Sequence, residues 1–301
     1  MPRDVPREIE RLTAALAAIL LTLGGFAARA EEADPAARGA YLTAAAGCDQ
    51  CHTDAKSGAH AYAGGRALET PFGTIFTPNI TPDRETGIGR WSFADFTRAL
   101  RWGIAPDDSH YQPTFPFAFY SRLSDRDLTD LKAFLDSVPA VSRVNAATLS
   151  GIFAAARTRA AIISVAECFP GPWQADATKD QNWNRGAYLV ATVGRCGDCH
   201  TPRNWLGVRD TERQLAGTSA GPGGKVVPNI TPDPETGIGR WSKDDITALL
   251  KDGQTPDFDF VGGAMIEIVK NTTRLTDADR SAIATYLRSL PAIRSESKAD
   301  H

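Results

Sequence analysis

Cys48-Asp49-Gln50-Cys51-His52 is a Cys-x-x-Cys-His segment, and the chain repeats it as Cys196-Gly197-Asp198-Cys199-His200. In such a segment the two thiols add to the vinyl groups of a haem as thioethers, and the adjacent histidine is held where it can ligate the iron. One copy would also fit half of a redox or zinc site, but two copies inside a longer repeat make coincidence a poor explanation. We therefore predict two covalently bound haem c groups. The predicted attachment residues are Cys48, Cys51, Cys196 and Cys199, and the predicted iron ligands are His52 and His200.

The two motifs lie inside an internal repeat. Residues 38–42 and 185–189 both read Arg-Gly-Ala-Tyr-Leu, and residues 77–92 match residues 227–242 closely. Duplication on this scale predicts two domains of similar size. The expected boundaries are 1–30 for a signal peptide, 31–139 for the first domain, 140–182 for a connector, 183–293 for the second domain and 294–301 for a polar tail.

Each repeat is expected to form three short helices joined by loops rich in glycine and proline. The first helix runs into the motif, over 35–46 and 183–193. The second begins after an N-cap serine, Ser92 or Ser242, with an aspartate three residues later. The third has apolar residues at helical spacing and ends at a proline. These apolar residues are Leu128, Leu131, Phe134 and Leu135 in the first repeat and Ile283, Tyr286, Leu287 and Leu290 in the second.

This pattern predicts an all-α fold in which long loops pack around a buried porphyrin. The loops show little of the alternation that strands would give. Gly39 and Gly186 are expected to allow a close crossing of the first and third helices, with Tyr41 and Tyr188 packed at the same crossing.

The two repeats differ where the iron needs a ligand opposite its histidine. Met265 lies just before the last predicted helix, and we predict that its thioether ligates the second iron. The equivalent position in the first repeat holds Phe115, which cannot ligate iron. The first iron is therefore either five-coordinate or bound by another side chain, with His110 as the preferred candidate and Tyr111 as a lesser one.

Four repeated residues are predicted to contact the haem propionates. Asn79 and Asn229 follow a turn-forming proline, and their amides are expected to bond either to a propionate or to nearby backbone. The indole N–H groups of Trp91 and Trp241 need partners when buried, so each ring either donates to a propionate or simply packs in the core.

The N-terminus predicts export. Basic residues precede an apolar run from Leu12 to Phe26, and Ala28-Arg29-Ala30 fits a signal-peptide cleavage site. We predict a periplasmic protein, with peripheral membrane association left open. An uncleaved anchor is the alternative, although the apolar run is short for a membrane span. The net charge of −3 predicts no nucleic-acid partner.

The motifs also carry a resemblance to a known family. Trp183–Leu189, Thr201–Asn204 and Pro228–Asp233, together with the second haem motif, are similar to the multihaem cytochrome c subunits of bacterial dehydrogenases for alcohols, aldehydes, gluconate and polyols. The likeness spans about 35–293. It implies two tandem class I cytochrome c domains. It further implies a dehydrogenase catalytic subunit as electron donor and a downstream cytochrome, quinone or oxidase as acceptor.

Three hypotheses about function follow from these features. The leading hypothesis is a dihaem electron carrier that serves a dehydrogenase in a respiratory chain, because the chain has no nucleotide motif and no hydrolytic constellation. The alternative is a dihaem enzyme, peroxidase-like or thiosulfate-oxidising, that uses an open or non-methionine first haem. A ligand sensor is a third reading of an open iron.

Overall fold

The computed structural model describes residues 34–70, 73–112, 114–146, 166–167 and 171–295. The predicted signal peptide, Cys168 and much of the connector lie outside these ranges. The helices and strands are α2 (Pro35–Ala46), α3 (Cys48–Cys51), η1 (Ala55–Ser57), β1 (Ala67–Thr70), β2 (Gly73–Phe76), α4 (Phe93–Trp102), α5 (Phe117–Tyr120), α6 (Asp125–Ser137), α8 (Gln181–Tyr188), η2 (Leu189–Val193), α9 (Cys196–His200), η3 (Thr211–Arg213), η4 (Pro222–Gly224), α10 (Lys243–Asp252), α11 (Met265–Thr272) and α12 (Asp277–Ser289).

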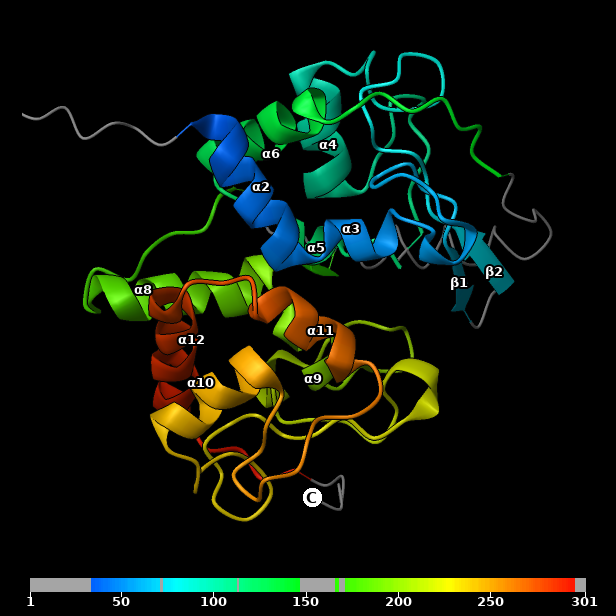
Figure 1. Ribbon diagram of the computed structural model, residues 1–301. Helices are drawn as coiled ribbons and strands as arrows, with labels where there is room; N and C mark the ends of the chain where they lie inside the picture. The colour runs from blue at the N-terminus through cyan, green and yellow to red at the C-terminus, as the bar shows by residue number, and fades with distance from the viewer. Residues whose placement is uncertain (1–33, 71–72, 113, 147–165, 168–170, 296–301) are drawn as a thin grey trace, which may run out of the picture. The chain divides into compact units, whose positions relative to one another are not determined.

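A close crossing of two helices organises each repeat. Helix α2 crosses α6, and α8 crosses α12 (Figure 1). A Cβ atom on Gly39 would lie 2.0 Å from the Asp130 carbonyl oxygen, and one on Gly186 would lie 2.0 Å from the Ala282 carbonyl oxygen. Both crossings therefore need glycine, which confirms the prediction for these two residues.

The second helix of each repeat begins as predicted. The Ser92 hydroxyl accepts the Asp95 backbone N–H at 3.1 Å, and the Asp95 carboxylate accepts the Ser92 backbone N–H at 3.0 Å. Ser242 and Asp245 form the same reciprocal pair at the start of α10. These capping boxes satisfy N–H groups that have no partner within the helix.

Two local elements depart from the predicted all-α pattern. Strands β1 and β2 form an antiparallel hairpin, in which the Thr74 hydroxyl donates to the Glu69 carboxylate across the strands at 3.0 Å. The first helix of the second repeat changes to a π-helical turn over Leu189–Val193 before it reaches the motif. Strands of four residues are too short to show alternation in the sequence, and a π-turn leaves no pattern of its own.

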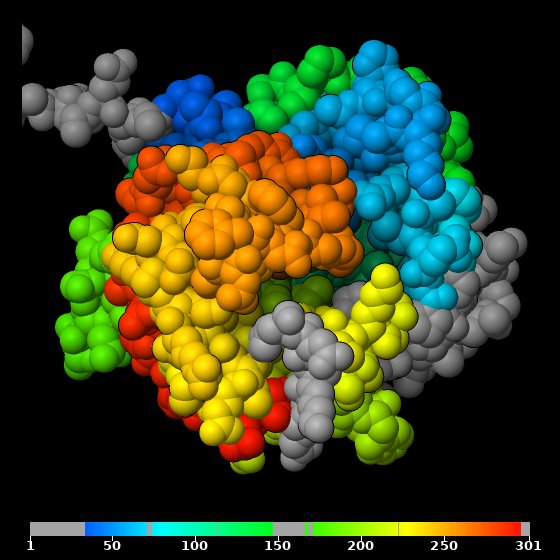
Figure 2. Space-filling view, turned by 60° about the horizontal axis from the view of Figure 1, so that its bottom comes forward, coloured from blue at the N-terminus to red at the C-terminus, as the bar shows by residue number. Residues whose placement is uncertain are grey.

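The two repeats share one core. The described residues from Pro35 onward form one compact unit, and a single apolar cluster contains Leu128 from the first repeat and Leu189 from the second, 0% and 2% exposed. Helix α11 lies against the first repeat, where the Gln50 side-chain amide donates to the Glu267 carbonyl at 2.6 Å. Figure 2 shows this orange segment against the blue and cyan residues of the first repeat. The boundaries between the two predicted domains stay a prediction.

Across the described residues, no helix combines the length and the apolar character that a membrane crossing requires.

Candidate haem sites

Each Cys-x-x-Cys segment forms a short helix that follows a left-handed residue. Helix α3 starts after Gly47, and α9 starts after Arg195, with φ values of 68° and 54°. All four motif cysteines are free thiols and are half-buried. Burial raises the pKa of Cys48 to about 12 and that of Cys196 to about 11. Cys48 and Cys196 are therefore protonated at neutral pH, and all four motif cysteines are unpaired, as thioether formation requires.

The motif histidines are oriented by one backbone carbonyl each. The Nδ1 atom of His52 lies 2.8 Å from the Pro78 carbonyl oxygen, and the Nδ1 atom of His200 lies 2.8 Å from that of Pro228. A carbonyl only accepts, so Nδ1 carries the proton and Nε2 keeps its lone pair for a metal. Burial also lowers the pKa of both imidazoles, although the carbonyl bond opposes that shift. Two thiols beside a neutral, oriented imidazole fit a covalent haem at each segment.

Asn79 and Asn229 hold the proline carbonyls in place. The Asn79 amide donates to the Thr86 hydroxyl at 3.0 Å and to the Val141 carbonyl at 2.7 Å, and its oxygen accepts from the Thr81 backbone at 2.9 Å. Asn229 makes the equivalent bonds in the second repeat. Both amides thus brace the Pro-Asn segment that orients the histidine, and their contact with a propionate stays a prediction. The sequence showed this segment as repeated but did not show that its carbonyl would meet the histidine.

The residues considered as ligands opposite the motif histidines lie in different local structures in the two repeats. Met265 is the first residue of α11 and is half-buried. Phe115 packs edge-on to Tyr111, with ring centroids 5.5 Å apart. His110 pairs with Ile104 in an isolated β-bridge, and its Nδ1 atom is buried without a hydrogen-bond partner in the described part of the chain. A buried nitrogen without a partner is costly unless something else binds it.

The rings of Trp91 and Trp241 are half-buried and pack against the shared apolar core. The Trp91 backbone N–H donates to the Ile88 carbonyl at 2.9 Å, and Trp241 repeats this bond to Ile238 at 3.0 Å. These turns place each ring just before the capping box of the next helix. Donation from either indole to a propionate stays a prediction.

The comparisons with known proteins agree with this geometry. The chain is 41% identical over 298 residues to a "Diheme cytochrome c-type" protein of Cereibacter sphaeroides, and the match covers 94% of this chain and 98% of that protein. The chain belongs to the cytochrome c family. The cytochrome c family model itself matches residues 36–139 of this cytochrome.

Subunits of larger assemblies are also among the relatives of this cytochrome. It is 38% identical to the "Fructose dehydrogenase cytochrome subunit" of Gluconobacter japonicus, over 95% of this chain and 60% of that protein. It is 37% identical to the "Alcohol dehydrogenase (quinone), cytochrome c subunit" of Gluconobacter oxydans, over 94% of this chain and 60% of that protein. The cytochrome therefore spans less than two thirds of the length of these two subunits.

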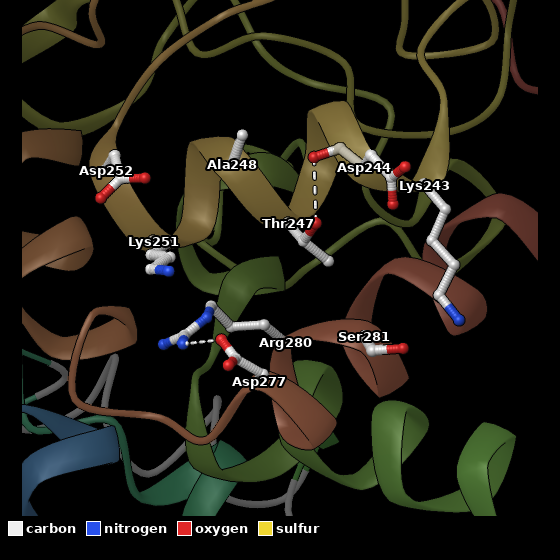
Figure 3. A pocket seen from close by; sticks show the side chains of 9 residues that line it. All are labelled: Lys243, Asp244, Thr247, Ala248, Lys251, Asp252, Asp277, Arg280 and Ser281. Atoms are coloured by element: carbon white, nitrogen blue, oxygen red, sulfur yellow. Dashed lines mark hydrogen bonds and ion pairs between the residues drawn. The ribbon is translucent and has the colours of Figure 1, made fainter.

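One surface cavity of the cytochrome lies away from the motif residues. Its volume is about 380 Å³, and it opens between α10 and α12 (Figure 3). Charged side chains line it, and Arg280 donates to Asp277 at 2.5 Å within it. Arg280 also donates to the Thr272 carbonyl at 2.9 Å, so its guanidinium closes the C-terminal end of α11.

Proposed function

We propose that this cytochrome carries two haem c groups and transfers electrons as a subunit or acceptor of a dehydrogenase. The observation that carries the proposal is the paired geometry of His52 with Pro78 and His200 with Pro228, because both repeats present the same oriented imidazole beside two free thiols. The names of the fructose and alcohol dehydrogenase subunits support a dehydrogenase as electron donor. The haem supplies the redox chemistry, and the protein supplies position and potential.

Haem content tests the first half of the proposal. The purified protein should give two haems per chain in a pyridine haemochrome assay. Replacing Cys48 and Cys51 together by alanine should leave one haem, and replacing Cys196 and Cys199 should do the same. A wild-type protein with one haem, or with zinc in place of haem, would contradict the assignment.

Electron transfer is tested with the oxidised holoprotein. Membranes are prepared from a strain of the native host in which this gene is deleted, and they are supplied with an alcohol, fructose or gluconate in separate assays. The substrate of the partner dehydrogenase should cause reduction of the added cytochrome. The absorbance of the reduced haem gives the rate. Peroxide turnover by the purified cytochrome, without such reduction, would favour the peroxidase-like alternative instead.

For the first haem, His110 is the sixth ligand that we favour. Its buried Nδ1 atom without a hydrogen-bond partner among the described residues supports this role. Burial raises the pKa of Tyr111 to about 12, which disfavours the tyrosinate that iron would need. His110→Ala should convert one haem to a high-spin form that binds carbon monoxide, while the exposed His60→Ala should not. A wild-type protein whose first haem already binds carbon monoxide would exclude His110 as a ligand.

The N-terminal sequence supports a proposal on the cellular location. We propose that residues 1–30 direct export to the periplasm and are removed after Ala30. N-terminal sequencing of the protein from the periplasmic fraction should begin at Glu31. Recovery of the intact N-terminus in the membrane fraction would instead identify an uncleaved anchor.

A further inference from the structure

Arg195 occupies a backbone position that favours glycine. It directly precedes the second motif, as Gly47 precedes the first, and both residues are left-handed, with φ values of 54° and 68°. Gly47 adopts this conformation without steric cost, whereas an arginine pays for the contact of its Cβ with the backbone. A costly conformation kept at a functional segment points to a role for the side chain.

The Arg195 side chain reaches from its own motif to the other one. Its Nη2 atom donates to the Ala46 carbonyl at 3.1 Å, two residues before Cys48. Its guanidinium lies 5.7 Å from the centre of the Tyr120 ring, and only 19% of its side chain is exposed. Its Nε atom is buried and lacks a hydrogen-bond partner within the described ranges. One buried cation therefore stands between the two attachment segments.

The carboxylate nearest to Arg195 is shared with a second arginine. Asp198 is the acidic partner of Arg195, and their closest atoms are 3.7 Å apart. The same carboxylate lies 2.6 Å from Arg203, which binds it more closely. The hydrogen bond from Arg195 to the Ala46 carbonyl places the charge beside the first motif.

We propose that the buried, permanently charged Arg195 of the second repeat raises the reduction potential of both haems. This inference rests on the proposed attachment of haem at the two motifs. Reduction adds an electron, and a nearby positive charge stabilises the reduced state. The effect is large because a buried charge acts through a low effective dielectric constant and is poorly screened by salt. The first haem thus depends on a residue of the other repeat.

Three variants separate charge from backbone strain. Arg195→Gly installs the residue that the first repeat uses, which removes the strain and the charge together. Arg195→Lys keeps the charge at the same position. Arg274→Gln is the matched control, because Arg274 also reaches from the second repeat to the first, where it lies 2.9 Å from Asp49, but its side chain is 40% exposed.

Spectroscopic redox titration of the holoprotein tests the proposal. In Arg195→Gly the reduction equilibrium constant of each haem should fall about tenfold, which corresponds to about 59 mV for one electron. Arg195→Lys should leave both reduction potentials close to those of wild type. Arg274→Gln should change the reduction equilibrium constant of each haem about threefold or less. Two unchanged potentials in Arg195→Gly, or a fall at the second haem alone, would overturn the proposal. The haemochrome assay on the same samples distinguishes that result from failure of haem attachment itself.

Discussion

The hydroxyl of Tyr41 in the first repeat donates a hydrogen bond of 2.7 Å to the carboxylate of Asp279 in the second. The same oxygen accepts the Thr276 backbone N–H at 3.0 Å, so Tyr41 completes the start of α12. Tyr188 repeats the arrangement in reverse, because it donates to Asp127 and accepts the Ser124 backbone N–H at 3.2 Å. Each repeat therefore caps the third helix of the other, a contact that the sequence did not predict.

Tyr41→Phe should destabilise the protein by about 1–2 kcal/mol, because it removes one hydrogen bond to a buried carboxylate. Asp279 keeps two contacts with Arg185, at 2.8 and 2.7 Å, which limits the loss. Urea unfolding followed by circular dichroism gives the change in the free energy of unfolding. Tyr286→Phe is the control, because its hydroxyl has no hydrogen bond among the described residues. Equal stability of the two variants would contradict the capping role.

Gly39→Ala should cost about 2–4 kcal/mol, since the new methyl group would overlap the Asp130 carbonyl at 2.0 Å and force α2 and α6 apart. The intrinsic helix preference of alanine would act in the opposite direction and is smaller. Gly262→Ala is the control, because a Cβ there meets no atom within 4 Å. Thermal unfolding of both variants measures the difference. A Gly39→Ala protein as stable as wild type would show that the helices can move apart at little cost.

The stability of the protein should fall in acid partly because of Asp279. Burial alone would raise the pKa of this carboxyl, but hydrogen bonds from Arg185 and Tyr41 outweigh burial and hold the pKa below its usual range. Its contribution is therefore complete above the unfolded-state pKa of about 3.9 and is lost as the pH falls through the lower folded-state pKa. The difference in unfolding free energy between wild type and Asp279→Asn should become smaller as the pH is lowered from 6 through the folded-state pKa of Asp279. A constant difference would exclude this linkage.

Met265→Ala should convert the second haem to a high-spin form that binds carbon monoxide, because no other methionine lies in the described residues. Phe115→Met supplies the matched gain of function, since it places a thioether at the equivalent position of the first repeat. That variant should acquire the optical signature of histidine–methionine ligation at the first haem and a raised potential there. An unchanged second haem in Met265→Ala would remove Met265 from the ligand set.

Patterns within a few residues of each other allowed much of the fold to be predicted. The serine–aspartate pairs at 92–95 and 242–245 specify helix starts, and Gly39 and Gly186 mark the helix crossings. Helix capping and apolar spacing act over one or two turns, so the sequence records them directly. The β1–β2 hairpin could not be predicted in the same way, because its strands are too short to show a period.

The sequence by itself determined the chemistry of the two motifs: two thiols and a histidine, held close together by covalent geometry whatever the rest of the chain does. Only the tertiary structure decided what surrounds them. The Pro78 carbonyl meets His52 from 26 residues away, and the Arg195 guanidinium meets the Ala46 carbonyl from 149 residues away. Such contacts depend on how the two repeats pack over a shared core, and no local pattern encodes that packing.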